Sequence, residues 1–97
     1  MSKGFSVRVE LHGATMTDYQ NLHTYMEQIG FSRTIRAGAA VCHLPTAEYI
    51  ISGNHTLQQV GEAAARAAAK TGKTNGIFAT ESAGWWASGL TPVRKAA

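Results

Sequence analysis

An unbroken alternation of apolar and polar residues near the start of the chain constrains the fold more than any other feature of the sequence. The apolar positions Phe5, Val7, Val9 and Leu11 alternate with the polar positions Ser6, Arg8, Glu10 and His12. A period of two predicts a β-strand with one apolar face and one polar face. Such a strand fits a sheet that is covered by helices on one side only.

The length of the chain limits what can be built around this strand. Ninety-seven residues suffice for a single domain over residues 1–97, with a thin core and two layers. Hydrophobic residues make up 44% and charged residues 15% of the chain, which is typical of a globular protein. We expect no signal peptide and no membrane span, and therefore a cytoplasmic protein. The low charge content is also compatible with a homodimer.

Two helices are predicted, because each of two apolar stripes follows a capping box. Thr17 and Gln20 form the first expected box, and the stripe behind it ends at Gly30. Thr56 and Gln59 form the second box, followed by a stripe of almost exclusively small side chains. A helix with such a stripe can lie close against a sheet.

Further strands are predicted over residues 32–36, 48–52 and 77–82. The segment 39–44 fits either a strand or a loop, Trp85 and Trp86 fit a short extra strand, and a loose basic tail follows about residue 90. The order β-α-β-β-α-β is that of the ferredoxin-like split βαβ fold. In this α+β fold both helices cover one face of an antiparallel sheet, and the first strand is central. The fold hosts many unrelated functions and does not indicate one.

Three polar residues of the first strand are candidates for chemistry on the uncovered face of the sheet. Glu10 and His12 lie two residues apart, and Arg8 precedes them at the same spacing. A carboxylate beside an imidazole can set its tautomer, and an arginine can stabilise a developing oxyanion. The same residues also fit a solvated cross-strand charge pattern without chemistry. The sequence leaves both interpretations open.

Neither a metal site nor a cofactor is predicted. The histidines His12, His23, His43 and His55 have no regular ligand spacing, and each also fits an ordinary surface or loop position. The single cysteine, Cys42, cannot form an internal disulfide or a metal cluster by itself. The sequence contains no phosphate-binding glycine loop and no nucleophile elbow.

Several basic and aromatic residues are candidates for contacts with RNA. The net charge of +3 allows a polyanionic partner without requiring one. Arg8, Arg33 and Arg36 are candidate phosphate contacts, and Trp85, next to Trp86, is a candidate for stacking on a base. The tryptophans also fit packing over the end of the sheet or burial in a dimer interface.

Two segments of the chain resemble a known protein family. LHTYMEQIGFSRTI from Leu22 to Ile35 and LPTAEY from Leu44, together with the second helix and the last strand, are similar to the endoribonuclease antitoxins of type V toxin–antitoxin systems. The resemblance covers most of the chain and rests on element order, length and these patterns. It implies a ferredoxin-like fold similar to the CRISPR adaptation endonucleases, cleavage of a toxin messenger RNA, and no bound organic cofactor.

The chain departs from this family at its candidate catalytic positions. His23 stands on the first helix where the family carries an arginine, and Glu10 and His12 stand where the CRISPR-type enzymes have an aspartate. The first hypothesis is a metal-independent endoribonuclease in which His12 or His23 is the general base on a ribose 2′-OH. The rival hypothesis is a non-catalytic module, such as a mobile-element inhibitor of a host system, that binds a protein through its sheet face or edge.

Overall fold

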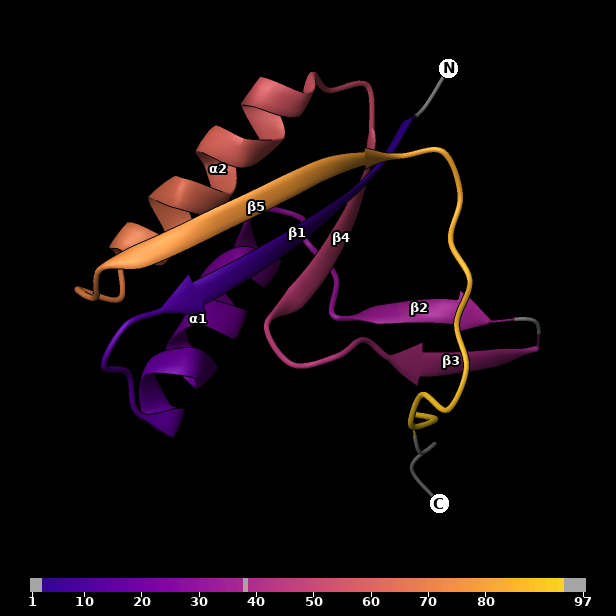
Figure 1. Ribbon diagram of the computed structural model, residues 1–97, viewed down its shortest axis with the longest axis horizontal. Coiled ribbons are helices and arrows are strands. Elements are labelled where there is room, and N and C mark those ends of the chain that lie inside the picture. The colour runs from indigo at the N-terminus through magenta and orange to yellow at the C-terminus, as the bar shows by residue number, and fades with distance from the viewer. Residues whose placement is uncertain (1–2, 38, 94–97) are drawn as a thin grey trace.

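The elements of the chain follow the order β-α-β-β-β-α-β in the computed structural model, which describes residues 3–37 and 39–93 (Figure 1). Their bounds are β1 Lys3–Leu11, α1 Met16–Gln28, β2 Thr34–Ala37, β3 Ala40–His43, β4 Glu48–Gly53, α2 Leu57–Ala69 and β5 Asn75–Ser82. The protein is therefore α+β, as predicted, with one strand more than the predicted order. The predicted tail residues Arg94 and Lys95 lie outside the described residues.

The predicted central position of β1 is confirmed. This strand lies in the middle of a three-stranded antiparallel sheet with the order β4-β1-β5, which we call the main sheet. Its register places Val7 opposite Tyr49 of β4 and Ala79 of β5. The apolar face predicted from the alternation is buried, namely Phe5, Val7, Val9 and Leu11. Burial of each such side chain contributes about 1.5–3 kcal/mol, so this alternation supplies much of the driving force for folding.

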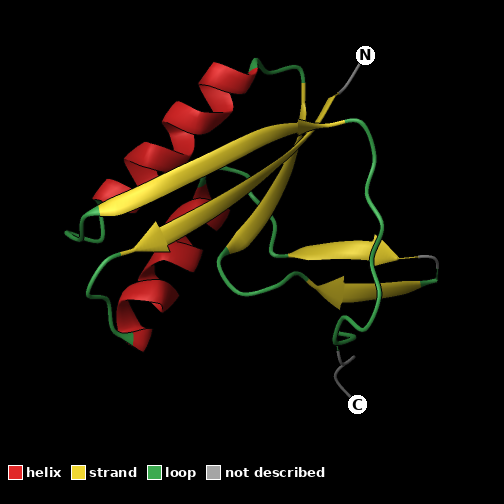
Figure 2. Cartoon of the chain, in the orientation of Figure 1, coloured by secondary structure: helices red, strands yellow, loops and turns green. Residues whose placement is uncertain are grey.

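Both described helices lie on the same face of the main sheet, behind it in Figure 1 and red in Figure 2. Leu22 and Met26 of α1 are buried against the core, together with the small residues Ala64, Ala67 and Ala68 of α2. These small side chains allow α2 to lie close to β5, as the sequence predicts. Neither described helix has the length and apolarity that a membrane-spanning helix requires.

The first helix begins two residues earlier than the sequence analysis predicts. Thr15, and not Thr17, is the N-cap: its Oγ1 accepts from the N–H of Asp18 at 3.2 Å, and the Asp18 carboxylate accepts from the N–H of Thr15 at 2.9 Å. A carboxylate in the first turn is stabilised by the helix dipole, which favours this box over one closed by the neutral Gln20. The predicted box of Thr56 with Gln59 is confirmed at the start of α2.

The predicted second strand does not extend the main sheet as a regular strand. β2 pairs with β3 in a separate antiparallel sheet of two strands, which we call the hairpin. A single bridge between Ser32 and Ile50 links the segment before β2 to the outer edge of β4. The segment 39–44, which the sequence left open, therefore forms a strand over most of its length. When β2 pairs with β3, it closes a much shorter loop than it would by pairing with β4. The smaller entropic cost of the shorter loop favours the hairpin.

The chain after β5 crosses from the main sheet to the hairpin. We call residues 83–93 the C-terminal strap; Figure 1 shows it passing from the end of β5 towards β3. The N–H of His43 donates to the carbonyl of Thr91, and the N–H of Val93 donates to the carbonyl of Val41, both at 2.9 Å. The short strand predicted at Trp85 and Trp86 does not form, because the pairing occurs later in the strap, where Pro92 lies opposite Cys42.

Candidate functional site

The face of the main sheet that no described helix covers, here called the open face, carries the polar side chains of β1. Arg8 lies in the middle of it, directly opposite Glu48 of β4 and Phe78 of β5. Phe78 is 72% exposed, which is unusual for a large aromatic side chain on a strand. Arg8 is exposed and forms no ion pair within the described part of the chain. An unpaired cation and an accessible aromatic ring therefore lie side by side on the open face.

Glu10 and His12 continue the same row towards the end of β1. Nδ1 of His12 lies 3.6 Å from Oε1 of Glu10, so the proximity predicted from the alternation is confirmed. The separation is longer than a hydrogen bond and corresponds to an electrostatic contact. On β5 the residue opposite Glu10 is Gly76, and the space above its Cα is empty to at least 4 Å. The pair is consequently accessible from the side of β5.

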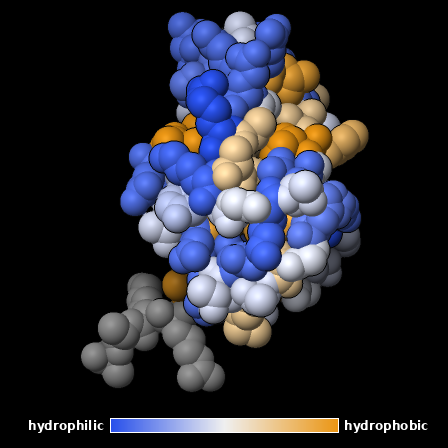
Figure 3. All heavy atoms as spheres, turned by 90° about the vertical axis from the view of Figure 1, so that its left-hand side faces the viewer, coloured by the Kyte–Doolittle hydropathy of each residue, from blue (hydrophilic) through white to orange (hydrophobic). Residues whose placement is uncertain are grey.

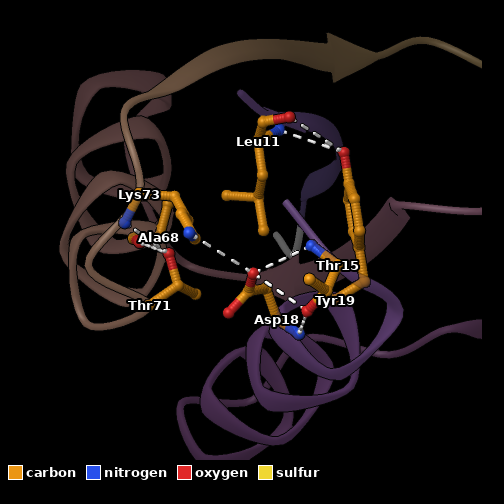
Figure 4. A network of polar contacts seen from close by, with 7 residues as sticks. All are labelled: Leu11, Thr15, Asp18, Tyr19, Ala68, Thr71 and Lys73. Carbon is orange, nitrogen blue, oxygen red and sulfur yellow. Dashed lines mark hydrogen bonds and ion pairs between the residues drawn. The ribbon is translucent and has the colours of Figure 1, made fainter. Parts of the chain in front are cut away.

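The backbone that carries His12 is fixed from two directions. The hydroxyl of Tyr19 accepts from the N–H of Leu11 at 3.1 Å and donates to its carbonyl at 3.4 Å (Figure 4). The N–H of His12 donates to the carbonyl of Thr74 at 2.9 Å. Leu11 lies beyond the last residue of β1 that pairs with β4, so Tyr19 satisfies backbone groups that the sheet leaves unpaired. Tyr19 also packs against the core from α1, and its apolar spacing along that helix predicts only this packing role.

A polar network links the start of α1 to the turn after α2 (Figure 4). The Asp18 carboxylate accepts from Thr15 and lies 3.8 Å from Nζ of Lys73. The hydrogen bond from the Thr15 backbone, with a smaller contribution from Lys73, lowers the pKa of Asp18. The N–H of Lys73 donates to Oγ1 of Thr71, which itself donates to the carbonyl of Ala68. The two loops that flank His12 are thus held together. The end of the molecule that carries them has a largely hydrophilic surface (Figure 3).

His23, the second candidate base, lies on the other side of the main sheet. It is half-buried on α1, and its Nδ1 lies 2.6 Å from Oη of Tyr49, a fully buried residue on the helix side of β4. Burial lowers the pKa of His23, with a further decrease from Arg33 and an opposing effect of Glu27. Burial also raises the pKa of Tyr49 to about 12. Both shifts favour a neutral imidazole next to a protonated phenol, and the tautomer of His23 sets which of the two groups donates the hydrogen bond.

The structure thus separates the candidate site residues into groups. Arg8, Glu10 and His12 share the open face, whereas His23 faces Tyr49 beneath the sheet. Arg33 and Arg36 are exposed beside and within β2, and Arg33 is close enough to influence the pKa of His23. The two histidines that the sequence analysis considers as bases do not face the same surface.

Trp85 and Trp86 line a groove between the main sheet, the hairpin and the C-terminal strap. The groove has a volume of about 960 Å³. On the sheet side it is lined by Ser6 and Thr80, whose hydroxyl oxygens are 2.8 Å apart. On the hairpin side it is lined by apolar residues that include Ile35 and Leu44. This groove could not be predicted from the sequence, because its outer wall depends on the path of the C-terminal strap.

Within residues 3–37 and 39–93, no three His, Cys, Asp or Glu side chains are grouped as metal ligands would be. Cys42 is buried in β3. A comparison of the chain with protein-family models, curated proteins and solved structures finds no significant match.

Proposed function

We propose that this protein acts on RNA, that it binds a single strand on the open face, and that it cleaves this strand as an endoribonuclease antitoxin would. The observation that carries the proposal is the pairing of Arg8 with Phe78 directly across β1 and β5. An exposed ring offers a stacking surface to a base, and a neighbouring guanidinium attracts the phosphate attached to it. The net charge of +3 favours the approach of a polyanion.

In this proposal His12 is the general base. It removes the proton from a ribose 2′-OH, and the resulting oxygen attacks the adjacent phosphorus while the 5′-oxygen leaves. Glu10, whose Oε1 lies 3.6 Å from Nδ1 of His12, orients the imidazole ring, and Arg8 of the same row stabilises charge on the phosphate. The leaving 5′-oxygen takes a proton from water, and His12 later releases its proton to water, so the products carry a 2′,3′-cyclic phosphate and a 5′-hydroxyl. His23 is less suited to this role, because it is half-buried and bonded to Tyr49.

We also infer that the architecture is a ferredoxin-like fold to which a hairpin has been added. The order β4-β1-β5 and the position of both described helices on one face support this relationship. The bridge between Ser32 and Ile50 also supports this relationship. It places the segment after α1 beside β4, at the edge where the strand after the first helix would complete a four-stranded sheet in that fold.

The proposal is tested with the pure protein and total cellular RNA, with and without a chelator, followed by mapping of the product ends. We expect cleavage in both conditions and cyclic phosphate ends. Binding without any cleavage would support the rival hypothesis of a non-catalytic module. Cleavage that leaves 3′-hydroxyl ends would contradict the role of His12.

Matched variants then locate the RNA-binding surface. Arg8→Ala and Phe78→Ala should each weaken the binding of a single-stranded oligonucleotide roughly fivefold or more. Arg66→Ala removes the same charge from α2, and Met16→Ala truncates another apolar side chain that is 78% exposed, on α1. Both controls should bind normally. Equal losses of oligonucleotide affinity in the variants and in the controls would rule out the open face as the RNA-binding site.

A further inference from the structure

We propose that a second copy of this chain binds at the outer edge of β5, so that the main sheets of the two copies join into one continuous sheet. The proposal rests on two features that lie side by side. One is a long edge strand without a partner, and the other is a row of small, exposed side chains on α2. Neither feature belongs to the row of Arg8, Glu10 and His12, so the proposal does not rest on the proposed function.

The outer edge of β5 is free, whereas the other long strand edges of the described chain are occupied. At the opposite edge of the main sheet, Ser32 and Ile50 exchange two backbone hydrogen bonds of 2.8 and 2.9 Å. In the hairpin, the strap covers the outer edge of β3, and β2 has only four residues. β5 is the last strand of the main sheet and has eight residues. Within residues 3–37 and 39–93, no backbone group on its outer edge has a hydrogen-bond partner.

β5 also lacks the features that commonly prevent an edge strand from pairing, which are lysine, proline and β-bulges. Its sequence, NGIFATES, contains neither of these residue types. Its register with β1 is unbroken from Asn75 to Ser82, so no bulge bends it. Its side chains leave apolar surface accessible: Phe78 is exposed on the open face, and Ile77 and Ala79 are only partly buried on the helix side. This edge is therefore ready to pair with another strand.

The side of α2 next to this edge is apolar and exposed. A methyl group at Gly61 would lie 4.0 Å from Cβ of Ala79, so this side of the helix faces β5. Leu57, Ala65 and Ala69 follow the same line along the helix, at a spacing of four residues, and all three are exposed. We call these three residues and Gly61 the small-residue row. Because the side chains at a contact set the distance between two helices, such a row allows a close approach.

The two features together favour a second copy over a strand from another protein. A two-fold axis perpendicular to the sheet makes the two β5 strands antiparallel and brings the two small-residue rows towards each other on the same side. A single extended peptide would pair with the edge but leave the row uncovered. Self-association also meets no electrostatic obstacle, because Glu81 is the only charged residue of β5 and the row has none.

The same symmetry restricts the register of the joined strands. Residues that lie opposite each other must point to the same face, so one residue of β5 lies opposite its own counterpart. With Ala79 in this position, Glu81 would lie opposite the apolar Ile77 of the partner subunit. With Phe78 in this position, Glu81 lies opposite the neutral amide of Asn75 of the partner subunit. The second register also forms a cross-strand pair of Phe78 rings, which is favourable, and we therefore assign it.

Analytical ultracentrifugation of the full chain without RNA tests the assembly. We expect the mass to rise from monomer to dimer as the protein concentration increases. Ala65→Arg places a long, charged side chain on the small-residue row and should weaken dimerisation by at least about tenfold. Since Ala65 is exposed, this variant should fold, which circular dichroism establishes. Gln20→Arg adds the same charge at an exposed position of α1 and should dimerise like the wild type.

Amide hydrogen exchange locates the interface. In an edge strand, every second N–H points away from the sheet and has no partner. In the dimer these outward amides of β5 bond to the partner subunit, so all amides from Asn75 to Glu81 should be protected. In Ala65→Arg, every second amide of this segment should exchange rapidly.

Two results would overturn the assignment. The first is a mass that stays that of the monomer at the highest soluble concentration, which would leave the edge to a strand of another protein. The second is a dimer that Ala65→Arg does not weaken, or one in which the outward amides of β5 exchange rapidly, because the interface would then lie elsewhere. Neither measurement involves RNA, so the failure of this proposal and the failure of the proposed function are distinguishable.

Discussion

The two candidate histidines differ in what surrounds each side chain, and this difference assigns them separate roles. His12 is largely exposed beside Glu10, on a backbone that Tyr19 and Thr74 hold in place. His23 shares a short hydrogen bond with buried Tyr49. An accessible imidazole on a fixed backbone suits proton transfer with a bound substrate, whereas a half-buried imidazole bonded to a buried tyrosine suits a structural role.

A substitution at His12 tests the first of these roles. We expect His12→Ala to slow RNA cleavage by roughly two orders of magnitude, the usual effect of losing a positioned general base, while the fold is retained. The rate is measured by single-turnover cleavage of a labelled oligonucleotide. His43→Ala, an exposed histidine of β3, serves as the control and should keep full activity. An unchanged rate in His12→Ala would show that His12 is an ordinary surface residue.

His23 should make the stability of the protein depend on pH. Its pKa in the folded state lies below the usual 6.5, so the unfolded chain binds more protons between these two values. The contribution of the neutral His23–Tyr49 pair is therefore fully present above about pH 6.5 and is lost as the pH falls through the folded pKa. Urea unfolding at pH 7.5 and pH 5.5 measures this loss.

The variant His23→Gln separates this effect from other titrations. Its amide oxygen can still accept from Tyr49, but the side chain does not titrate, so the decrease in stability on acidification should become smaller. His12→Gln leaves the His23–Tyr49 pair intact, so this variant should retain the decrease in stability that the pair causes. Identical pH profiles for the wild type and His23→Gln would contradict the assigned cause.

Among the elements, β1 determines the register of the main sheet. Val9 is buried on its apolar face, so Val9→Asp places an unpaired carboxylate in the core at a cost of several kcal/mol and should abolish folding. Phe78→Asp introduces the same group on the exposed side of β5 and should fold normally. Circular dichroism and thermal unfolding distinguish the two. A stable Val9→Asp variant would show that the register is wrong.

The elements that the sequence predicted correctly are those set by local patterns. The alternation in β1 and the capping box at Thr56 depend on neighbours a few residues away, and both are confirmed. The box at Thr17 was wrong, because two overlapping boxes compete and the carboxylate of Asp18 favours Thr15. The extra strand at Trp85 was wrong because the strap pairs with β3, a contact between segments about fifty residues apart.

Like the fold, the candidate site could be predicted from the sequence only where local patterns determine it. The row of Arg8, Glu10 and His12 follows from alternation alone, and the structure places these residues together. Phe78 joins the row only because β5 pairs with β1 in a particular register, which a single sequence does not specify. The contact of Tyr49 with His23 could likewise not be predicted, since Tyr49 belongs to a strand that is distant in the sequence.

At the scale of the whole molecule, the net charge of +3 favours the approach of a polyanion. The open face presents Arg8 to solvent directly opposite Glu48, whereas Glu81 lies opposite Phe5, on the helix side of the main sheet.

RNA binding should consequently depend strongly on salt. The logarithm of the affinity should fall linearly with the logarithm of the salt concentration, with a slope of about −0.7 for each neutralised phosphate on a single strand. Arg8→Ala should reduce the magnitude of this slope by the contribution of about one phosphate, and Arg66→Ala should not. Fluorescence anisotropy of a labelled oligonucleotide measures the slope. Affinity that is independent of salt would exclude binding through phosphates.

The attachment of the strap has a consequence for the hierarchy of amide hydrogen exchange. The strap is joined to β3 by the N–H groups of His43 and Val93, whereas β1 is paired on both of its sides. Release of the strap breaks few contacts, so these two amides should exchange together through a local opening of low free energy. The amides of Val7 and Val9 should exchange only when the whole domain unfolds. The groove can thus open and close many times during the lifetime of a core that stays intact.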